Sequence, residues 1–225
     1  LDGVLQSDGV IDPPPAQVAG WVAALRRAGG LWIADEVQGG HGRTGTAMWS
    51  FERFGIVPDL VTLGKPMGNG HPIAAVITRR DLAQAFAADG SFFSTFAGNP
   101  VAASAALAVL DVLRDERVLP RVVGVGADLR ARLRTVSTGH PAVADVRGVG
   151  LANAVEFVTG ATSLRPSPAH AAAVRDGLRQ RGVLVGTTGR FGNVLKVRPP
   201  LALRHSDVPV IVDAFARELD ALPPD

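Results

Sequence analysis

Lys65 and Lys196 are the two lysines in a chain of 225 residues that contains 23 basic residues in all. Positive charge is otherwise supplied by arginine, whose guanidinium stays protonated and cannot form an imine. A lysine kept against this background is a candidate for chemistry that needs an amine. The competing interpretation is that chance alone preserved the two lysines.

Asp35 and Lys65 are predicted to project from the same edge of one sheet. Asp35 ends the apolar stretch 31–34, and Lys65 follows a second apolar stretch, 59–63. Ligands of open α/β sheets bind at the carboxyl ends of the strands. A pyridoxal phosphate (PLP) enzyme needs this pair, because the lysine forms an imine with the cofactor and the carboxylate keeps the pyridine nitrogen protonated. The plainer alternative is an ion pair at a sheet edge, with the lysine in a solvated Gly/Pro turn.

The framework for these residues is predicted by strands that alternate with helices in the first half of the chain. The expected strands cover 31–34, 59–63 and 73–78, and the expected helices cover 16–28, a segment through Trp49 and Phe54, and 100–114. Strands separated by helices favour a βαβ arrangement with a mainly parallel sheet. This half of the chain is therefore expected to have an α/β fold.

The pattern changes near residue 111, where an α+β unit is predicted to begin. Its expected helices cover 122–134, 168–181 and 206–222, and its expected strands lie near 143–146, 151–158, 183–186 and 194–197. We therefore expect two domains, 1–110 and 111–225.

Five spaced segments of the sequence together resemble one enzyme family. They are LWIADEVQ at 31–38 with GRTG at 42–45, PDLVTLGK at 58–65, STFAGNP at 94–100, VRGVGL at 146–151 and PPL at 199–201. In this order and spacing they resemble the class III aminotransferases, PLP-dependent enzymes of fold type I. The resemblance implies that 1–110 is a partial PLP-binding large domain, whose N-terminal half is missing here. It implies that 111–225 is the small C-terminal domain.

The resemblance also implies a role for individual residues. Lys65 would hold PLP as a Schiff base and later move the substrate proton, and Asp35 would be the partner of the pyridinium nitrogen. Val37 would pack against one face of the ring, and Gln38 would hydrogen-bond near its phenolic oxygen. Thr95 would bind the phosphate of the cofactor in a neighbouring subunit, which implies a homodimer.

Each of these residues also has a plainer interpretation. Taken alone, Val37 is typical of a core residue and Gln38 of a polar surface residue. Thr95 stands before a helical pattern and could be an ordinary N-cap. These alternatives remain open on the sequence alone.

Lys196 and Arg198 are the candidate substrate-binding residues. Many class III transaminases carry an arginine three residues before the paired prolines, where it binds the substrate carboxylate, and this chain has Lys196 there. Lysine is a point charge without the bidentate fork that suits a carboxylate, so it could serve a phosphate. Arg198 lies on the same face only if the strand is regular through Val197, and is otherwise a solvent-facing charge.

Three functions follow from these residues. The first is a PLP-dependent aminotransferase that moves an amino group between an amine or amino acid and an oxo acid or aldehyde. The second is a phospho-lyase acting on an amino-alcohol phosphate, because KPMGNGHP at 65–72 is similar to the branch that contains ethanolamine-phosphate phospho-lyase. The third is a catalytically silent fragment of a larger or split PLP enzyme.

Composition argues against several other classes of function. The net charge of +2, without any basic run, does not suit nucleic-acid binding. The absence of cysteine excludes disulfides and thiolate metal sites, and no histidine or carboxylate spacing suggests another metal site. No apolar run is long enough for a membrane span, and no signal peptide is apparent, so we expect a cytoplasmic protein.

Overall fold

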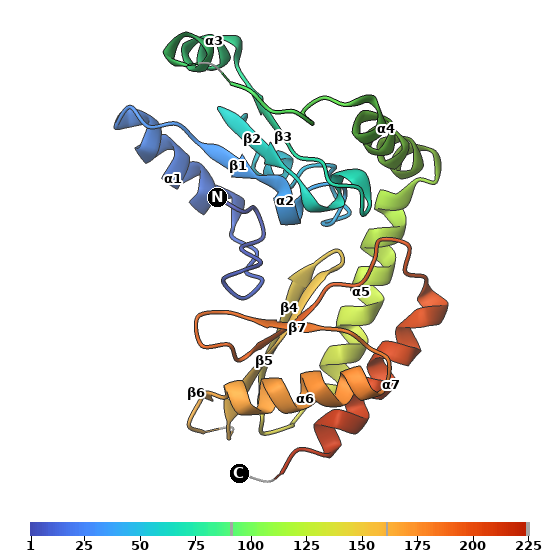
Figure 1. Ribbon diagram of the computed structural model, residues 1–225. Coiled ribbons are helices and arrows are strands. Elements are labelled where there is room, and N and C mark those ends of the chain that lie inside the picture. Colours follow the sequence, from blue (N-terminus) through green and yellow to red (C-terminus); the bar gives the residue numbers. More distant parts are fainter. Residues whose placement is uncertain (91, 161, 224–225) are drawn as a thin grey trace. The chain divides into compact units, whose positions relative to one another are not determined.

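Figure 1 shows the computed structural model, which describes residues 1–90, 92–160 and 162–223. The chain divides into two units. Unit 1 comprises Leu1–Gly3, Pro13–Gly42 and Ala47–Val118, and unit 2 comprises Val4–Asp12, Arg43–Thr46 and Leu119–Asp225. The boundary expected near residue 110 falls within helix α4 (Pro100–Asp115), which belongs entirely to unit 1.

A three-stranded sheet in the order β1-β2-β3 lies at the centre of unit 1. Strands β1 (Ile33–Asp35) and β2 (Leu60–Leu63) are parallel, whereas β3 (Ala75–Thr78) runs antiparallel to β2. The chain between β2 and β3 holds only the short 3-10 helix η2 (Lys65–Gly68). A parallel return needs a crossover of roughly a dozen residues or more, usually with an α-helix, so this short connection turns β3 back along β2.

One face of this sheet packs on helix α1 (Pro15–Arg27) and on the 3-10 helix η1 (Ser50–Phe54). The buried residues of this core are Val18, Val22, Trp32, Ala34, Phe54, Val61 and Leu63. Because side chains alternate along a strand, Ile33 and Asp35 lie on the opposite face, where both are exposed. The remaining helices of unit 1 are α2 (Glu36–Gly39) and α3 (Arg80–Asp89).

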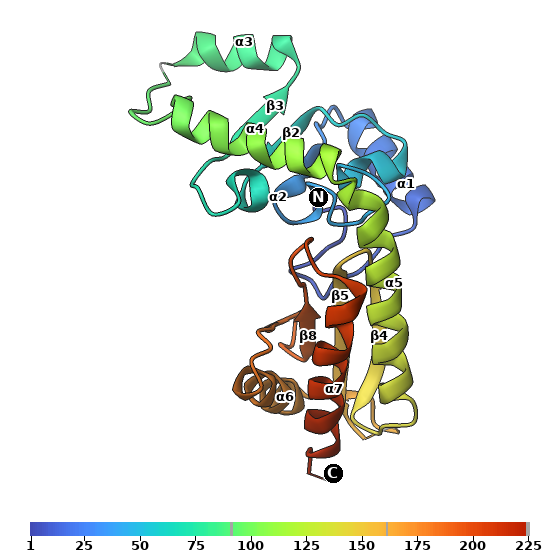
Figure 2. The same ribbon diagram turned by 90° about the vertical axis from the view of Figure 1, so that its right-hand side faces the viewer.

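Unit 2 is built on an antiparallel sheet in the order β4-β5-β8-β7, with β6 beside β5. Its strands are β4 (Val143–Val149), β5 (Ala152–Thr159), β6 (Arg165–Pro166), β7 (Gly186–Thr188) and β8 (Val194–Val197). Its helices are α5 (Val118–Ser137), α6 (Pro168–Gln180), the 3-10 helix η3 (His205–Asp207) and α7 (Val208–Asp220). Figure 2 shows α5, α6 and α7 alongside this sheet, and α6 contacts β5, β7, β8 and α7.

The turn between β4 and β5 requires glycine because backbone from elsewhere in unit 2 approaches it closely. Gly150 has a φ of +52°, and a Cβ there would lie 2.5 Å from the carbonyl oxygens of Arg43 and Thr44. The amide of Leu151 donates to the Arg43 carbonyl at 3.1 Å. The segment Arg43–Thr46 is therefore held against the hairpin through its own backbone.

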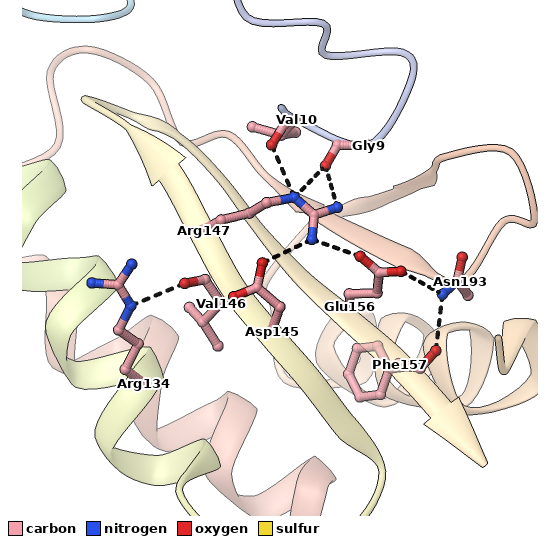
Figure 3. A network of polar contacts seen from close by, with 9 residues as sticks. All are labelled: Gly9, Val10, Arg134, Asp145, Val146, Arg147, Glu156, Phe157 and Asn193. Carbon is pink, nitrogen blue, oxygen red and sulfur yellow. Dashed lines mark hydrogen bonds and ion pairs between the residues drawn. The ribbon is translucent and has the colours of Figure 1, made fainter. Parts of the chain in front are cut away.

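Arg147 of β4 holds the segment Val4–Asp12 within unit 2, as Figure 3 shows. Its Nε donates to the carbonyls of Gly9 and Val10 at 3.1 Å, and its Nη2 donates to Gly9 at 2.7 Å. Val10 is fully buried with a φ of +57°, a conformation that β-branched residues rarely adopt. Such a conformation persists only where the surroundings over-determine it, and the bonds from Arg147 contribute to that constraint.

Two carboxylates fix the Arg147 guanidinium from the side of the sheet (Figure 3). Its Nη1 donates to Asp145 at 3.0 Å and to Glu156 at 2.6 Å. The Asn193 amide donates in turn to Glu156 at 3.3 Å and to the Phe157 carbonyl at 2.9 Å. The guanidinium fork is thus oriented by charge on one side and binds backbone carbonyls on the other.

Candidate active site

Asp35 and Lys65 come from neighbouring parallel strands of unit 1. The register pairs Asp35 with Thr62, and Lys65 follows β2 three positions after Thr62. Because both strands run in the same direction, both residues belong to the carboxyl end of this sheet. Both residues are exposed in this chain, so the carboxylate and the amine are accessible to a ligand.

The Asp35 carboxylate is held through one oxygen only. Its Oδ1 accepts hydrogen bonds from the Val37 amide at 3.1 Å and from the Thr62 hydroxyl at 3.3 Å. Its Oδ2 accepts no hydrogen bond from the part of the chain that the structure describes. Asp35 therefore caps the short helix α2 and keeps one oxygen available for another donor.

The Lys65 side chain has no hydrogen-bond or ion-pair partner among residues 1–90, 92–160 and 162–223. The ion pair with Asp35, which was the plainer interpretation of the pair, is thus not formed between these described residues. Lys65 has a φ of +30°, in a region that non-glycine residues rarely adopt. Strained backbone of this kind clusters at functional sites, where the surrounding structure over-determines it.

The turn that carries Lys65 is supported by neighbouring elements of unit 1. Helix α4 packs against η2, and the buried residues of α4 are Ala102, Ala106 and Leu113. Val37 and Gln38 lie in α2, and both are half-buried. A Cβ on Gly64 would lie 3.7 Å from both methyl groups of Val37, so the valine lies directly beside the lysine turn.

Thr95 is exposed in the segment before α4 and is not the N-cap of that helix. The cap is Asn99, whose side chain accepts from the Ala102 amide at 2.9 Å and donates to the Phe96 carbonyl at 2.8 Å. Within the described residues the Thr95 hydroxyl makes no hydrogen bond. The ordinary structural role considered for Thr95 is therefore filled by another residue.

Lys196 and Arg198 belong to unit 2 and are described within it. Lys196 is half-buried in β8, where it pairs with Ala154 of β5 and Gly186 of β7. The pairing of β8 is regular through Val197, and Arg198 follows it as an exposed residue. The condition for Lys196 and Arg198 to share a face, a strand regular through Val197, is met.

Arg43 was missed as a functional candidate, although it lies in one of the family-like segments. It is half-buried and donates to the carbonyls of Pro199 at 2.6 Å and Leu151 at 3.2 Å. Burial, together with the nearby charge of Arg198, lowers the pKa of Arg43 to about 10. Arg43 therefore supports the turn that follows the two candidate substrate-binding residues.

Neither a cluster of metal-binding side chains nor an apolar helix of membrane-spanning length occurs in the part of the chain that the structure describes. No three histidine or carboxylate side chains are grouped there as a metal ion would require. None of the helices described combines the length and the apolar character needed to cross a membrane.

Comparison with known proteins assigns the chain to a family. The aminotransferase class-III family matches residues 2–219. Alanine–glyoxylate aminotransferase 2 homolog 2 of Arabidopsis thaliana is 38% identical over 207 residues, which are 92% of this chain and 43% of that protein. Ethanolamine-phosphate phospho-lyase homolog 1 of Caenorhabditis elegans is 36% identical over 214 residues, covering 94% of this chain and 46% of the relative.

A solved structure with the same fold is that of a phospholyase from Arthrobacter in complex with phosphoethanolamine. The two align with a TM-score of 0.93 and 39% identity, over 99% of this chain and 53% of the other. The chain thus spans about half the length of the relatives that it matches.

Proposed function

The chain belongs to the class-III aminotransferases, a family of pyridoxal-phosphate enzymes, and on that basis we propose that it carries the cofactor lysine and the small domain of a PLP-dependent aminotransferase. The reaction is the transfer of an amino group between an amine or amino acid and an oxo acid or aldehyde. The observation that carries the proposal is the pair Asp35 and Lys65 at one end of parallel strands, each with a group left unengaged.

The side chains at this end of the sheet suit the chemistry of PLP. The protonated ring nitrogen of PLP needs a hydrogen-bond acceptor, and Asp35 Oδ2 accepts no hydrogen bond from the described residues. The aldehyde of PLP needs an amine, and the Lys65 amine has no partner in the described chain. Val37, beside the lysine turn, offers an apolar contact for the ring. When bound, PLP supplies an electron sink. Asp35 would hold the proton of the ring nitrogen, and Lys65 would take the proton from the substrate carbon and deliver it to the cofactor carbon that carried the aldehyde.

A homodimer is part of this proposal, with Thr95 contributing to the phosphate site of the neighbouring subunit. Its support is the Thr95 hydroxyl, which makes no hydrogen bond to the residues that the structure describes, and the apolar surface around it. Phe92, Phe93 and Phe96 have exposed fractions of 71%, 86% and 79%. Large exposed apolar patches often mark protein contacts. Sedimentation of the complete polypeptide tests this, and a monomer with bound PLP would contradict it.

Trapping of the cofactor on one lysine is the direct test of the site. Borohydride should fix PLP to Lys65, identified by the mass of the labelled peptide, and Lys65→Arg should lose the adduct. An adduct on Lys196 instead would refute the assignment. If residues 1–225 give no adduct with PLP on any lysine, these residues are catalytically silent by themselves.

The second candidate is a phospho-lyase that acts on an amino-alcohol phosphate. It is favoured by Lys196 in place of the carboxylate-binding arginine and by the similarity to the phospholyase that binds phosphoethanolamine. The complete polypeptide should then release phosphate from phosphoethanolamine without an amino acceptor. Strict dependence on an oxo acid would reject the lyase and support the transaminase.

A further inference from the structure

Thr62 is the side chain that holds Asp35 from the neighbouring strand. Thr62 and Asp35 are Cα partners in the parallel pairing of β1 and β2, so their side chains lie on the same face of the sheet. The Thr62 hydroxyl donates to Asp35 Oδ1 at 3.3 Å, and the Val37 amide donates to the same oxygen at 3.1 Å. Both donors reach one oxygen and leave the other without a partner in the described chain.

We propose that Thr62 is a positioning residue, whose hydroxyl fixes the Asp35 carboxylate so that Oδ2 is the oxygen presented to the ring nitrogen of PLP. This inference rests on the proposed function, because it assigns Asp35 to that nitrogen. It adds a residue to the site that lies in strand β2, three positions before Lys65.

The contact restricts a side chain that would otherwise rotate. Asp35 is exposed, so no packing limits its torsion angles. The Val37 amide holds it from α2, and the Thr62 hydroxyl holds it from β2, so the carboxylate is fixed from two elements. Threonine suits this task because its β-branched side chain has few rotamers in a strand. A pre-oriented acceptor binds its ligand without a further loss of side-chain entropy.

Substitutions at positions 62 and 78 separate positioning from general stability. Thr62→Val removes the hydroxyl with little change of shape, and Thr62→Ser retains it. Thr78→Val is the matched control, because Thr78 lies on the adjacent strand β3 and its hydroxyl donates to the Asp59 carbonyl at 2.9 Å. The complete polypeptide is used for each variant, and the readouts are the Kd of PLP and the pH profile of the bound cofactor's absorbance.

Thr62→Val should weaken PLP binding about tenfold, as expected for a lost hydrogen bond to a carboxylate, and should displace the absorbance profile. Thr62→Ser should bind within about twofold of the unmodified protein, because its hydroxyl can still donate. Thr78→Val should leave both readouts unchanged even if it lowers the melting temperature. With Asp35→Asn in place, Thr62→Val should have no further effect on the profile.

Two failures are distinguishable. If Lys65→Arg and Asp35→Asn change cofactor binding and absorbance but Thr62→Val does not, the positioning role is wrong and the proposed function stands. If Asp35→Asn also leaves the profile unchanged, the assignment of Asp35 is wrong and the role of Thr62 falls with it. Equal losses in Thr62→Val and Thr62→Ser would also overturn the proposal, because the hydroxyl would then be irrelevant.

Discussion

Adjacent carboxylates at positions 35 and 36 have opposite environments. Asp35 is exposed, whereas Glu36 has an exposed fraction of 1%. Glu36 accepts from the Ser50 amide at 2.7 Å, the Ser50 hydroxyl at 2.6 Å and the Phe51 amide at 2.9 Å. Burial raises the pKa of Glu36, and these hydrogen bonds offset part of that effect. Glu36 thus holds the start of η1, while Asp35 stays open to a ligand.

Replacement of Glu36 with alanine should destabilise unit 1 by about 3 kcal/mol, because buried donors of Ser50 and Phe51 would lose their acceptor. Glu36→Gln should cost less, since its amide oxygen can still accept. Glu52→Ala is a suitable control, because Glu52 is exposed and accepts one bond, from the Trp49 amide at 3.1 Å. Urea unfolding measures the difference, and equal losses in Glu36→Ala and Glu52→Ala would contradict the structural role of Glu36.

His41 should make the stability of unit 1 depend on pH. It has an exposed fraction of 2%, its ring lies edge-on to Trp49 at 4.9 Å, and its Nδ1 has no hydrogen-bond partner in the described chain. Burial lowers the pKa of His41 below the usual 6.5. The unfolded chain therefore takes up this proton first as the pH falls. The contribution of neutral His41 to the free energy of unfolding should be complete above pH 6.5. It should decrease as the pH falls from 6.5 to the lower pKa that His41 has in the folded protein.

His41→Asn should flatten this decline, and asparagine tolerates the φ of +55° at the position. The comparison is unfolding by urea between about pH 5 and pH 7, the range in which a histidine with a lowered pKa titrates. His71→Asn is the control because His71 lies in the same unit and is only half-buried. An unchanged slope in His41→Asn would show that another group is responsible.

At the scale of elements, the sequence located most helices and strands but not their partners. Strand 194–197 was predicted with its observed bounds, and the helix expected at 16–28 is observed at Pro15–Arg27. Helix α3 was not predicted, although Leu82 and Phe86 stand four residues apart in it, and none of its residues is buried. The Thr62–Asp35 contact depends on the register of two strands, which hydrophobic pattern alone does not specify across a parallel pair.

Helix α5 contacts the β4–β5 turn at a point where two backbones come very close, at Gly126 and Gly150. A Cβ on Gly126 would lie 2.1 Å from the Gly150 carbonyl oxygen, which is backbone and cannot rotate away. Gly126→Ala should therefore cost about 2 kcal/mol through overpacking. Gly124→Ala, in the same helix, meets only the exposed His205 ring at 3.4 Å and should be neutral or stabilising by up to about 1 kcal/mol. Thermal unfolding should place the two variants on opposite sides of the unmodified protein or show Gly126→Ala clearly lower; equal melting temperatures would contradict the contact.

At the scale of the whole molecule, each unit is assembled from segments that are separated in the sequence. Val4–Asp12 and Arg43–Thr46 belong to unit 2, although their neighbours belong to unit 1. The sequence pattern changes near residue 111, but it does not indicate that these two segments, here called excursions, belong to unit 2. Segments of nine and four residues are too short to show a pattern of their own. Which unit a short segment belongs to is decided by its contacts with residues far away in the sequence. A local sequence pattern carries no information about those contacts.

The excursion at Val4–Asp12 should therefore be necessary for the stability of unit 2. Val4 and Val10 are fully buried and share a core cluster with Ala152, Ala154 and Val194. A polypeptide of residues 119–223 would lose both valines and the carbonyls that Arg147 binds. Burial of two valines is worth roughly 3–5 kcal/mol, so it should melt about 10–20 °C below unit 2 in the whole chain. A peptide of residues 1–14 added in trans should raise that melting temperature, and the same peptide with Val10→Asp should not. If residues 119–223 melt like the whole chain and ignore the peptide, the excursion is not part of the core of unit 2.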